Sequence, residues 1–335
     1  MSWNRMLGHD RLIKGFQAVW TNQRLGQAYL FIGPRGVGKF TFARELARAI
    51  LCEKSGPGLE ACEQCRSCIL AGAGTHPDLL MAAKPEDKNE LVIAVIRDLC
   101  EQLVRKPALG TRKVAIVDDA GEMNEEAANC FLKTLEEPAP GSILILIGGP
   151  SADRQLRTIQ SRCQIIHFAG LSESNVRQVI SSRKEPEYSV DELSIALAAG
   201  SPGLAIEFAE PHFRELRQQL VADLLKPRSD AFAWAEQWLK SLENFSKDTA
   251  GQRVTSRMLI RVLIELARLA WHWHLGDRAG NAEISGPVSQ FAQRFSYAQL
   301  DQLLFRLQKT DEQIDRMLQM NYAIESMAMD IVPVG

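Results

Sequence analysis

Short apolar runs alternate with longer amphipathic stretches through residues 1–170. The runs are typical of buried strands, and apolar residues recur at helical spacing in the stretches between them. The runs are "AYLFI" (28–32), "HPDLLMAA" (76–83), "RKVAIVDDA" (112–120), "SILILIGG" (142–149) and "CQIIHF" (163–168). Helices are expected in "FTFARELARAIL" (40–51), "LVIAVIRDLCEQLVRKP" (91–107) and "NEEAANCFLKTLEEP" (124–138). Such alternation predicts an α/β domain with a parallel sheet and helices on both faces.

From residue 171 onward the pattern is helical, with short breaks. We expect three domains: an α/β domain at 1–170, a small helical domain at 171–209 and an all-α domain at 210–335. The second boundary depends only on the break at "AEPHF" (209–213). The segment 254–276 is apolar on much of its circumference, so it needs neighbours on several sides.

Composition and charge place the chain among ordinary globular proteins. It has 335 residues, 46% hydrophobic and 24% charged, with a net charge of −2. Any nucleic-acid contact must therefore be local or come from partners. No apolar stretch is long enough to span a membrane, and the start has no apolar signal core. We expect a cytoplasmic protein without membrane contact.

The stretch "GPRGVGKFTF" (33–42) nearly matches a phosphate-binding loop between a strand and a helix. Gly33 and Gly38 allow close approach of phosphates to the backbone, and Lys39 supplies a charge to them. The next position normally ligates Mg²⁺ through a hydroxyl but is Phe40; Thr41 lies about 100° further round the helix. A glycine turn without nucleotide is the simpler alternative. The pattern leaves ATP and Mg²⁺ binding open.

Two acids, Asp118 and Asp119, follow the apolar run at 114–117. That pattern places carboxylates at the carboxyl edge of a sheet, facing the phosphate loop. In a working ATPase the first acid supports Mg²⁺, and the second, usually Glu, polarises the attacking water. Asp119 is one methylene shorter. A solvated pair at a strand end is the alternative.

Four of the seven cysteines crowd into residues 52–68 as C-x9-C-x2-C-x2-C, at Cys52, Cys62, Cys65 and Cys68. Four thiolates in a tetrahedron form a structural zinc site that is closed to substrate. Disulfides and an iron–sulfur cluster are the alternatives. The remaining cysteines resemble ordinary buried apolar residues.

These segments together resemble the bacterial DNA polymerase III clamp-loader subunits, members of the AAA+ class. The matching pieces are "LGH" near the start, the phosphate loop, the cysteine insertion, "HPDL", "NCFLKTLEEP" and "SRC". The resemblance covers about residues 5–210 with definite motifs. It implies an AAA+ domain with a zinc insertion, a helical lid at 171–209 and a collar at 210–335 that joins subunits. A helical bundle that buries only its own core is compatible with the same pattern.

Within that family the chain is similar to the delta-prime type rather than to the gamma/tau motor type. Relative to a motor it has Phe40 in the loop, Asp119 in the acidic pair, Gly148 and Gly149 in place of a polar sensor, and Gly203 in place of a sensor arginine. The "SRC" arginine is retained as Arg162. The resemblance implies that Arg162 acts in trans on a neighbouring ATPase site.

The function implied is that of a clamp-loader stator, which helps load the sliding clamp on primed DNA and whose own ATPase is weak or absent. Its partners would be gamma/tau-like and delta-like subunits. The alternatives are an active gamma/tau-like motor and, from another class, a zinc-dependent nucleic-acid-binding protein.

Overall fold

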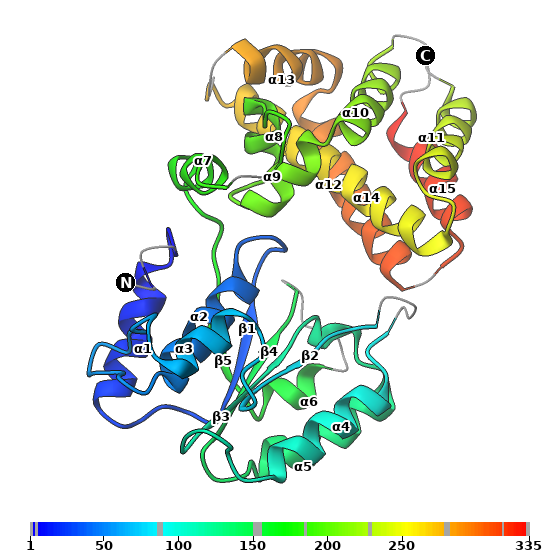
Figure 1. Cartoon of the computed structure of the whole chain (residues 1–335). Coiled ribbons are helices and arrows are strands. Elements are labelled where there is room, and N and C mark those ends of the chain that lie inside the picture. The colour runs from blue at the N-terminus through cyan, green and yellow to red at the C-terminus, as the bar shows by residue number, and fades with distance from the viewer. Residues whose placement is uncertain are drawn as a thin grey trace. The chain divides into compact units, whose positions relative to one another are not determined.

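The structure is a computed structural model in which the chain forms two compact units, Met1–Asn175 and Val176–Gly335. The first contains the sheet, and the second is helical (Figure 1). The residues that the structure describes are 3, 6–85, 90–149, 156–183, 186–226, 230–277, 282–316 and 318–332.

The N-terminal unit is built on a parallel five-stranded sheet in the order β2-β3-β4-β1-β5. Each apolar run predicted as a strand forms one. The strands are β1 (Ala28–Ile32), β2 (Leu79–Ala82), β3 (Lys113–Val117), β4 (Ser142–Ile147) and β5 (Gln164–His167). This order, with the glycine loop directly after β1, agrees with the predicted AAA+ fold. Strands β1, β3 and β4 are buried, whereas the edge strand β5 is largely exposed.

Helices cover both faces of this sheet, as the alternating pattern predicts. They are α1 (Asp10–Thr21), α2 (Lys39–Leu51), α3 (Arg66–Gly72), α4 (Ile93–Val104), α5 (Glu125–Glu136) and α6 (Leu156–Gln160), with a 3₁₀ turn, η2, at Ala120–Glu122. Because side chains alternate along a strand, Tyr29 and Phe31 of β1 pack with Phe16 of α1 and Phe42 of α2. Leu30 instead joins the core beneath α4 and α5.

Gly33, the first residue after β1, is required by packing inside the domain. Its φ is +149°, and a Cβ there would lie 2.3 Å from the carbonyl oxygen of Phe168. The residue must therefore be glycine even if no phosphate approaches it.

We expect Gly33→Ala to lower the free energy of unfolding of the N-terminal unit by about 2–4 kcal/mol, because strain and a backbone clash act together. Gly149→Ala is the matched control, since a Cβ at that position meets nothing within 4 Å. Chemical denaturation of both variants is the measurement. Equal stabilities would contradict the packing requirement.

The C-terminal unit is helical throughout the residues that the structure describes. Its elements begin with α7 (Glu173–Ser181), which crosses the division between the units, followed by α8 (Glu192–Leu197), α9 (Pro202–Ala209), α10 (Pro211–Leu224), α11 (Ala231–Phe245), α12 (Thr249–His274), α13 (Ala282–Arg294), α14 (Tyr297–Asp315) and α15 (Met320–Ile331). Among the described helices, none has the combination of length and apolarity that crossing a bilayer demands.

Side chains on either side of the predicted break at 209–213 pack against one another. Phe208 of α9 and Phe213 of α10 stack with ring centroids 5.7 Å apart. The buried Arg217 of α10 also pairs with Asp191, which caps α8. The segments 171–209 and 210–335 therefore share a core where they meet, and their separation into lid and collar stays a prediction.

Candidate functional site

The phosphate-loop segment lies at the carboxyl edge of the sheet, between β1 and α2, as its sequence context predicts. Gly36 and Gly38 both have positive φ, +74° and +104°. Gly38 is the N-cap of α2, so the loop delivers the chain to a helix N-terminus. This is the backbone shape of a phosphate-binding loop.

The lysine of this loop is turned back onto the loop itself. Lys39 is buried, and its Nζ donates to the carbonyl oxygens of Gly33 and Pro34, at 2.7 Å each. Burial raises the pKa of Asp118, and the ammonium charge of Lys39 offsets part of that rise. In this conformation the ammonium is satisfied by loop carbonyls, so a phosphate that paired with Lys39 would have to replace these hydrogen bonds.

A second side chain, that of His9, also contacts the backbone of the loop. His9 is buried against Phe42 and Phe168, and its Nε2 donates to the carbonyl oxygen of Val37 at 3.0 Å. Burial lowers the pKa of His9, which keeps the imidazole neutral at physiological pH. His9 belongs to the "LGH" motif, which was the available signal, but its contact with the loop was not predicted.

Of the positions that would bind Mg²⁺ and activate water, 118 and 119 have carboxylates, but position 40 lacks a hydroxyl. Phe40 and Thr41 are both exposed at the start of α2. Asp118 is half-buried, and burial, followed by the charge of Asp119, raises its pKa. Asp119 is exposed, with φ +47°. The two acids thus lie at the predicted edge of the sheet, although the hydroxyl ligand is absent from position 40.

The positions to which the resemblance assigns sensor side chains, 148–149 and 203, are glycines. Gly148 continues the ladder by donating its N–H to the carbonyl of Phe31, and Gly149 follows it. A Cβ on Gly149 would have open space, so the fold has room for a side chain at a position where the sequence has none. Gly203 lies in the first turn of α9, which Ser201 caps.

Arg162 lies at the opposite edge of the sheet from the phosphate loop. It precedes β5, and the register Tyr29↔Gln164 places it level with Gln27, ahead of β1. Gly33 follows Gln27 by six residues. At ~3.3 Å per residue, Arg162 therefore lies about 20 Å from Gly33 along the strand direction. That span exceeds the reach of an arginine side chain. Arg162 cannot serve the phosphate loop of its own chain.

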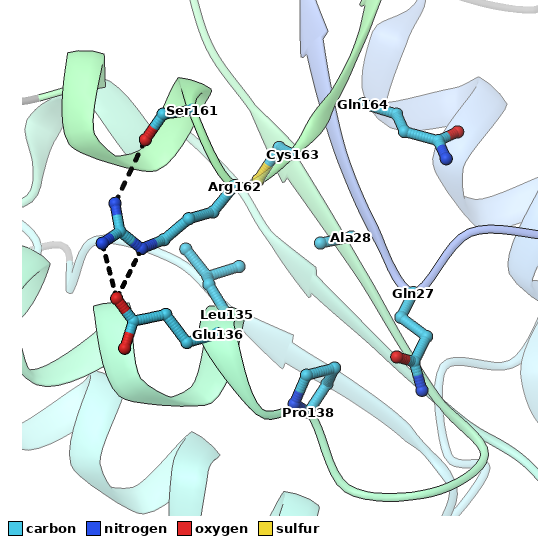
Figure 2. A pocket seen from close by; sticks show the side chains of 9 residues that line it. All are labelled: Gln27, Ala28, Leu135, Glu136, Pro138, Ser161, Arg162, Cys163 and Gln164. Atoms are coloured by element: carbon cyan, nitrogen blue, oxygen red, sulfur yellow. Dashed lines mark hydrogen bonds and ion pairs between the residues drawn. The ribbon is translucent and has the colours of Figure 1, made fainter.

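Arg162 is one of the residues that line an open pocket of about 350 Å³, and its guanidinium points toward Glu136 and Ser161 (Figure 2). The side-chain exposure of Arg162 is 32%, so the residue points to the surface rather than into the interior. Its guanidinium reaches Glu136, at the end of α5. The contact with Glu136 was not predicted; the "LKTLEEP" segment, which contains this residue, was the available signal.

The four cysteines of the insertion converge, as their spacing predicts. All four Sγ atoms lie within 4.8 Å of one another; Cys52 and Cys65 are 4.0 Å apart, and Cys62 and Cys68 are 3.9 Å apart. A tetrahedral ion with metal–sulfur bonds of about 2.3 Å separates its ligands by about 3.8 Å, so the cluster fits a metal. No disulfide joins them.

Backbone amides already point at these sulfurs. The N–H of Cys65 donates to the Sγ of Cys62 at 3.3 Å, and that of Cys68 donates to Cys65 at 3.3 Å. N–H groups of Gln64 and Cys65 lower the pKa of Cys62 to about 6. These amides stabilise the thiolate of Cys62, the form that binds metal, whereas burial raises the pKa values of Cys52 and Cys68.

The insertion is fixed to the helices on its side of the sheet. Trp3 donates its Nε1–H to the carbonyl of Leu59 at 2.7 Å, and Trp20 of α1 donates to Gly56 at 3.1 Å. Arg48 of α2 donates to the carbonyl of Cys68 at 3.2 Å. His76 is buried, its Nδ1 accepts the N–H of Asp78, and it is not among the four residues whose ligand atoms converge.

Comparison with known proteins identifies the family. The profile of the family described as "DNA polymerase III, delta subunit" matches residues 8–172. The "DNA polymerase III subunit delta'" of Pseudomonas aeruginosa is 36% identical over 231 residues, covering 66% of this chain and 70% of the relative. The protein of the same name from Escherichia coli is 30% identical over 310 residues, covering 91% and 87%. This chain belongs to the DNA polymerase III delta-prime family.

Proteins named as tau subunits match over a shorter region. The "DNA polymerase III subunit tau" of Escherichia coli is 31% identical over 172 residues, 51% of this chain and 26% of the relative. The delta-prime relatives of Pseudomonas aeruginosa and Escherichia coli cover more of this chain, 66% and 91%, at comparable or higher identity, which confirms the family predicted from the motifs.

Proposed function

We propose that this chain is the stator subunit of a DNA polymerase III clamp loader and completes the ATPase site of a neighbouring motor subunit. It would work beside gamma/tau-like and delta-like subunits, helping to place the sliding clamp on primed DNA. The duplex would be held through its phosphates, without sequence readout. Residues 171–209 would be its lid, and 210–335 its part of the collar.

The observation that carries this proposal is the position of Arg162. It is exposed about 20 Å along the sheet from the loop of its own chain. An arginine there can act only on a phosphate that another molecule brings. At the same time the local loop has Phe40 in place of a hydroxyl ligand and an inward-turned Lys39. Such a chain contributes to catalysis at a partner's site rather than at its own.

The four cysteines would hold a structural Zn²⁺. The ion would cross-link four points of a short, glycine-containing insertion that has little core of its own. The trans arginine and the zinc site are separate features of the proposal, and each can be tested alone.

The purified chain, incubated with ATP and Mg²⁺, is expected to show no turnover above that of its Lys39→Ala variant, because the metal ligand after the lysine is missing. Phosphate release is the measurement. Brisk hydrolysis that Lys39→Ala abolishes would instead identify an active motor subunit. Salt-sensitive DNA binding by the chain alone, lost on chelation, would identify a zinc-dependent nucleic-acid-binding protein.

A further inference from the structure

The guanidinium of Arg162 has hydrogen-bond partners at each of its three nitrogens (Figure 2). Its Nε and Nη2 donate to one carboxylate oxygen of Glu136, at 2.8 and 2.5 Å. Its Nη1 donates to the carbonyl of Thr158 at 2.9 Å and to the hydroxyl of Ser161 at 3.1 Å. The last turn of α5 and the end of α6 therefore fix this side chain from two directions.

Glu136 occupies an unfavourable position for an acid. It is the last residue of α5, where the helix macrodipole and unpaired carbonyls disfavour negative charge. Lys133, in the same turn, is the residue type that this end normally favours. Arg162 offsets the cost at Glu136.

The pair is also accessible to solvent and exchangeable. The side chains of Arg162 and Glu136 are 32% and 51% exposed, so water and salt screen their attraction. A contact of this strength orients an arginine without preventing its transfer to a phosphate, whose charge is larger and whose bidentate geometry suits a guanidinium.

We propose that Glu136 is a positioning residue for Arg162. It holds the guanidinium at the edge of the sheet, in the orientation from which a neighbouring subunit's triphosphate can accept it. This inference depends on the proposed function, since it concerns the same arginine. Glu136 itself does not contact the nucleotide.

We expect Glu136→Ala to lower kcat for ATP hydrolysis in the assembled complex by about fivefold, the equivalent of one exposed charge pair. The measurement uses a complex in which only the motor subunit beside this chain retains activity. KM for ATP should not change, because the arginine acts on the transition state. Glu136→Gln keeps an acceptor oxygen for Nε and Nη2, so its kcat should lie between those of Glu136→Ala and the wild type.

Two controls separate positioning from a general structural effect. Glu137→Gln removes the same charge one residue later, at the C-cap of α5, and should leave kcat unchanged. Combining Glu136→Ala with Arg162→Ala should reduce kcat no further than Arg162→Ala alone, since the two residues act as one unit.

A kcat for Glu136→Ala equal to or above the wild-type value would overturn the positioning role. So would a double variant whose losses multiply. These outcomes remain distinct from a failure of the proposed function, in which Arg162→Ala itself has no effect.

Discussion

Arg162→Ala is expected to abolish most ATP hydrolysis at the motor site beside this chain while leaving the chain folded. An arginine supplied in trans accelerates phosphoryl transfer by roughly 10³–10⁵ in other phosphate-loop systems, because it stabilises the charge that develops on the transferred group. The residue is exposed, and its local partners are one carboxylate, one carbonyl and one hydroxyl. Its removal should therefore cost about 1 kcal/mol or less of folding free energy.

The measurement is single-turnover hydrolysis by the reconstituted complex, in which the other motor subunits are inactivated. Arg157→Ala is the matched control, because it removes the same charge from the short helix α6 just before Arg162. Thermal unfolding of each purified chain excludes misfolding. An unchanged rate for Arg162→Ala, or an equal loss for Arg157→Ala, would contradict a specific role in trans.

The strands of the sheet could be predicted because each one corresponds to a short, continuous pattern in the sequence. Buried parallel strands read as continuous apolar runs, and "SILILI" forms the fully buried β4. Asn124 caps α5 by accepting the N–H of Ala127, and asparagine is among the residues favoured at this position of a helix. The paired x2 spacings likewise predicted the convergence of the cysteines.

The unpredicted contacts of the site join residues that are distant in sequence. Glu136 and Arg162 are 26 residues apart, and His9 and Val37 are 28 apart. They meet because β1 lies between β4 and β5 and because α1 packs beside α2. That arrangement follows from the order of the strands, which no local pattern records. The contact of Lys39 with the loop carbonyls also could not be predicted from the motif. The same sequence is compatible with a lysine side chain that points toward a phosphate.

Gly33 illustrates how a correct motif can have an incomplete explanation. From the sequence, Gly33 is expected to let a phosphate approach the backbone closely. The structure shows a neighbour already in place, the carbonyl of Phe168. A degenerate loop can therefore keep this glycine after nucleotide chemistry is lost, so its presence does not indicate ATP use.

Removing the metal is expected to unfold the insertion at 52–68 while the sheet persists. Structural Zn²⁺ in small sites contributes apparent binding free energies of about 10–16 kcal/mol, far more than this segment's few buried side chains can replace. Trp3 and Trp20 donate to the carbonyls of Leu59 and Gly56, so their fluorescence should change when the segment is released. The measurements are metal content by mass spectrometry, tryptophan fluorescence during chelation, and limited proteolysis around Gly56.

Cys68→Ser should reproduce the effect of chelation, since Cys68 is fully buried within the cluster. Cys100→Ser is the control: this thiol lies in the α4–α5 region, accepts a hydrogen bond from Thr134, and should retain both metal and fluorescence. One zinc per chain, lost only in the cluster variant, supports the assignment. Stoichiometric iron with visible absorbance would instead indicate an iron–sulfur cluster. A metal-free chain with an intact, protease-resistant insertion would show that packing against α1 and α2 alone holds these four cysteines together.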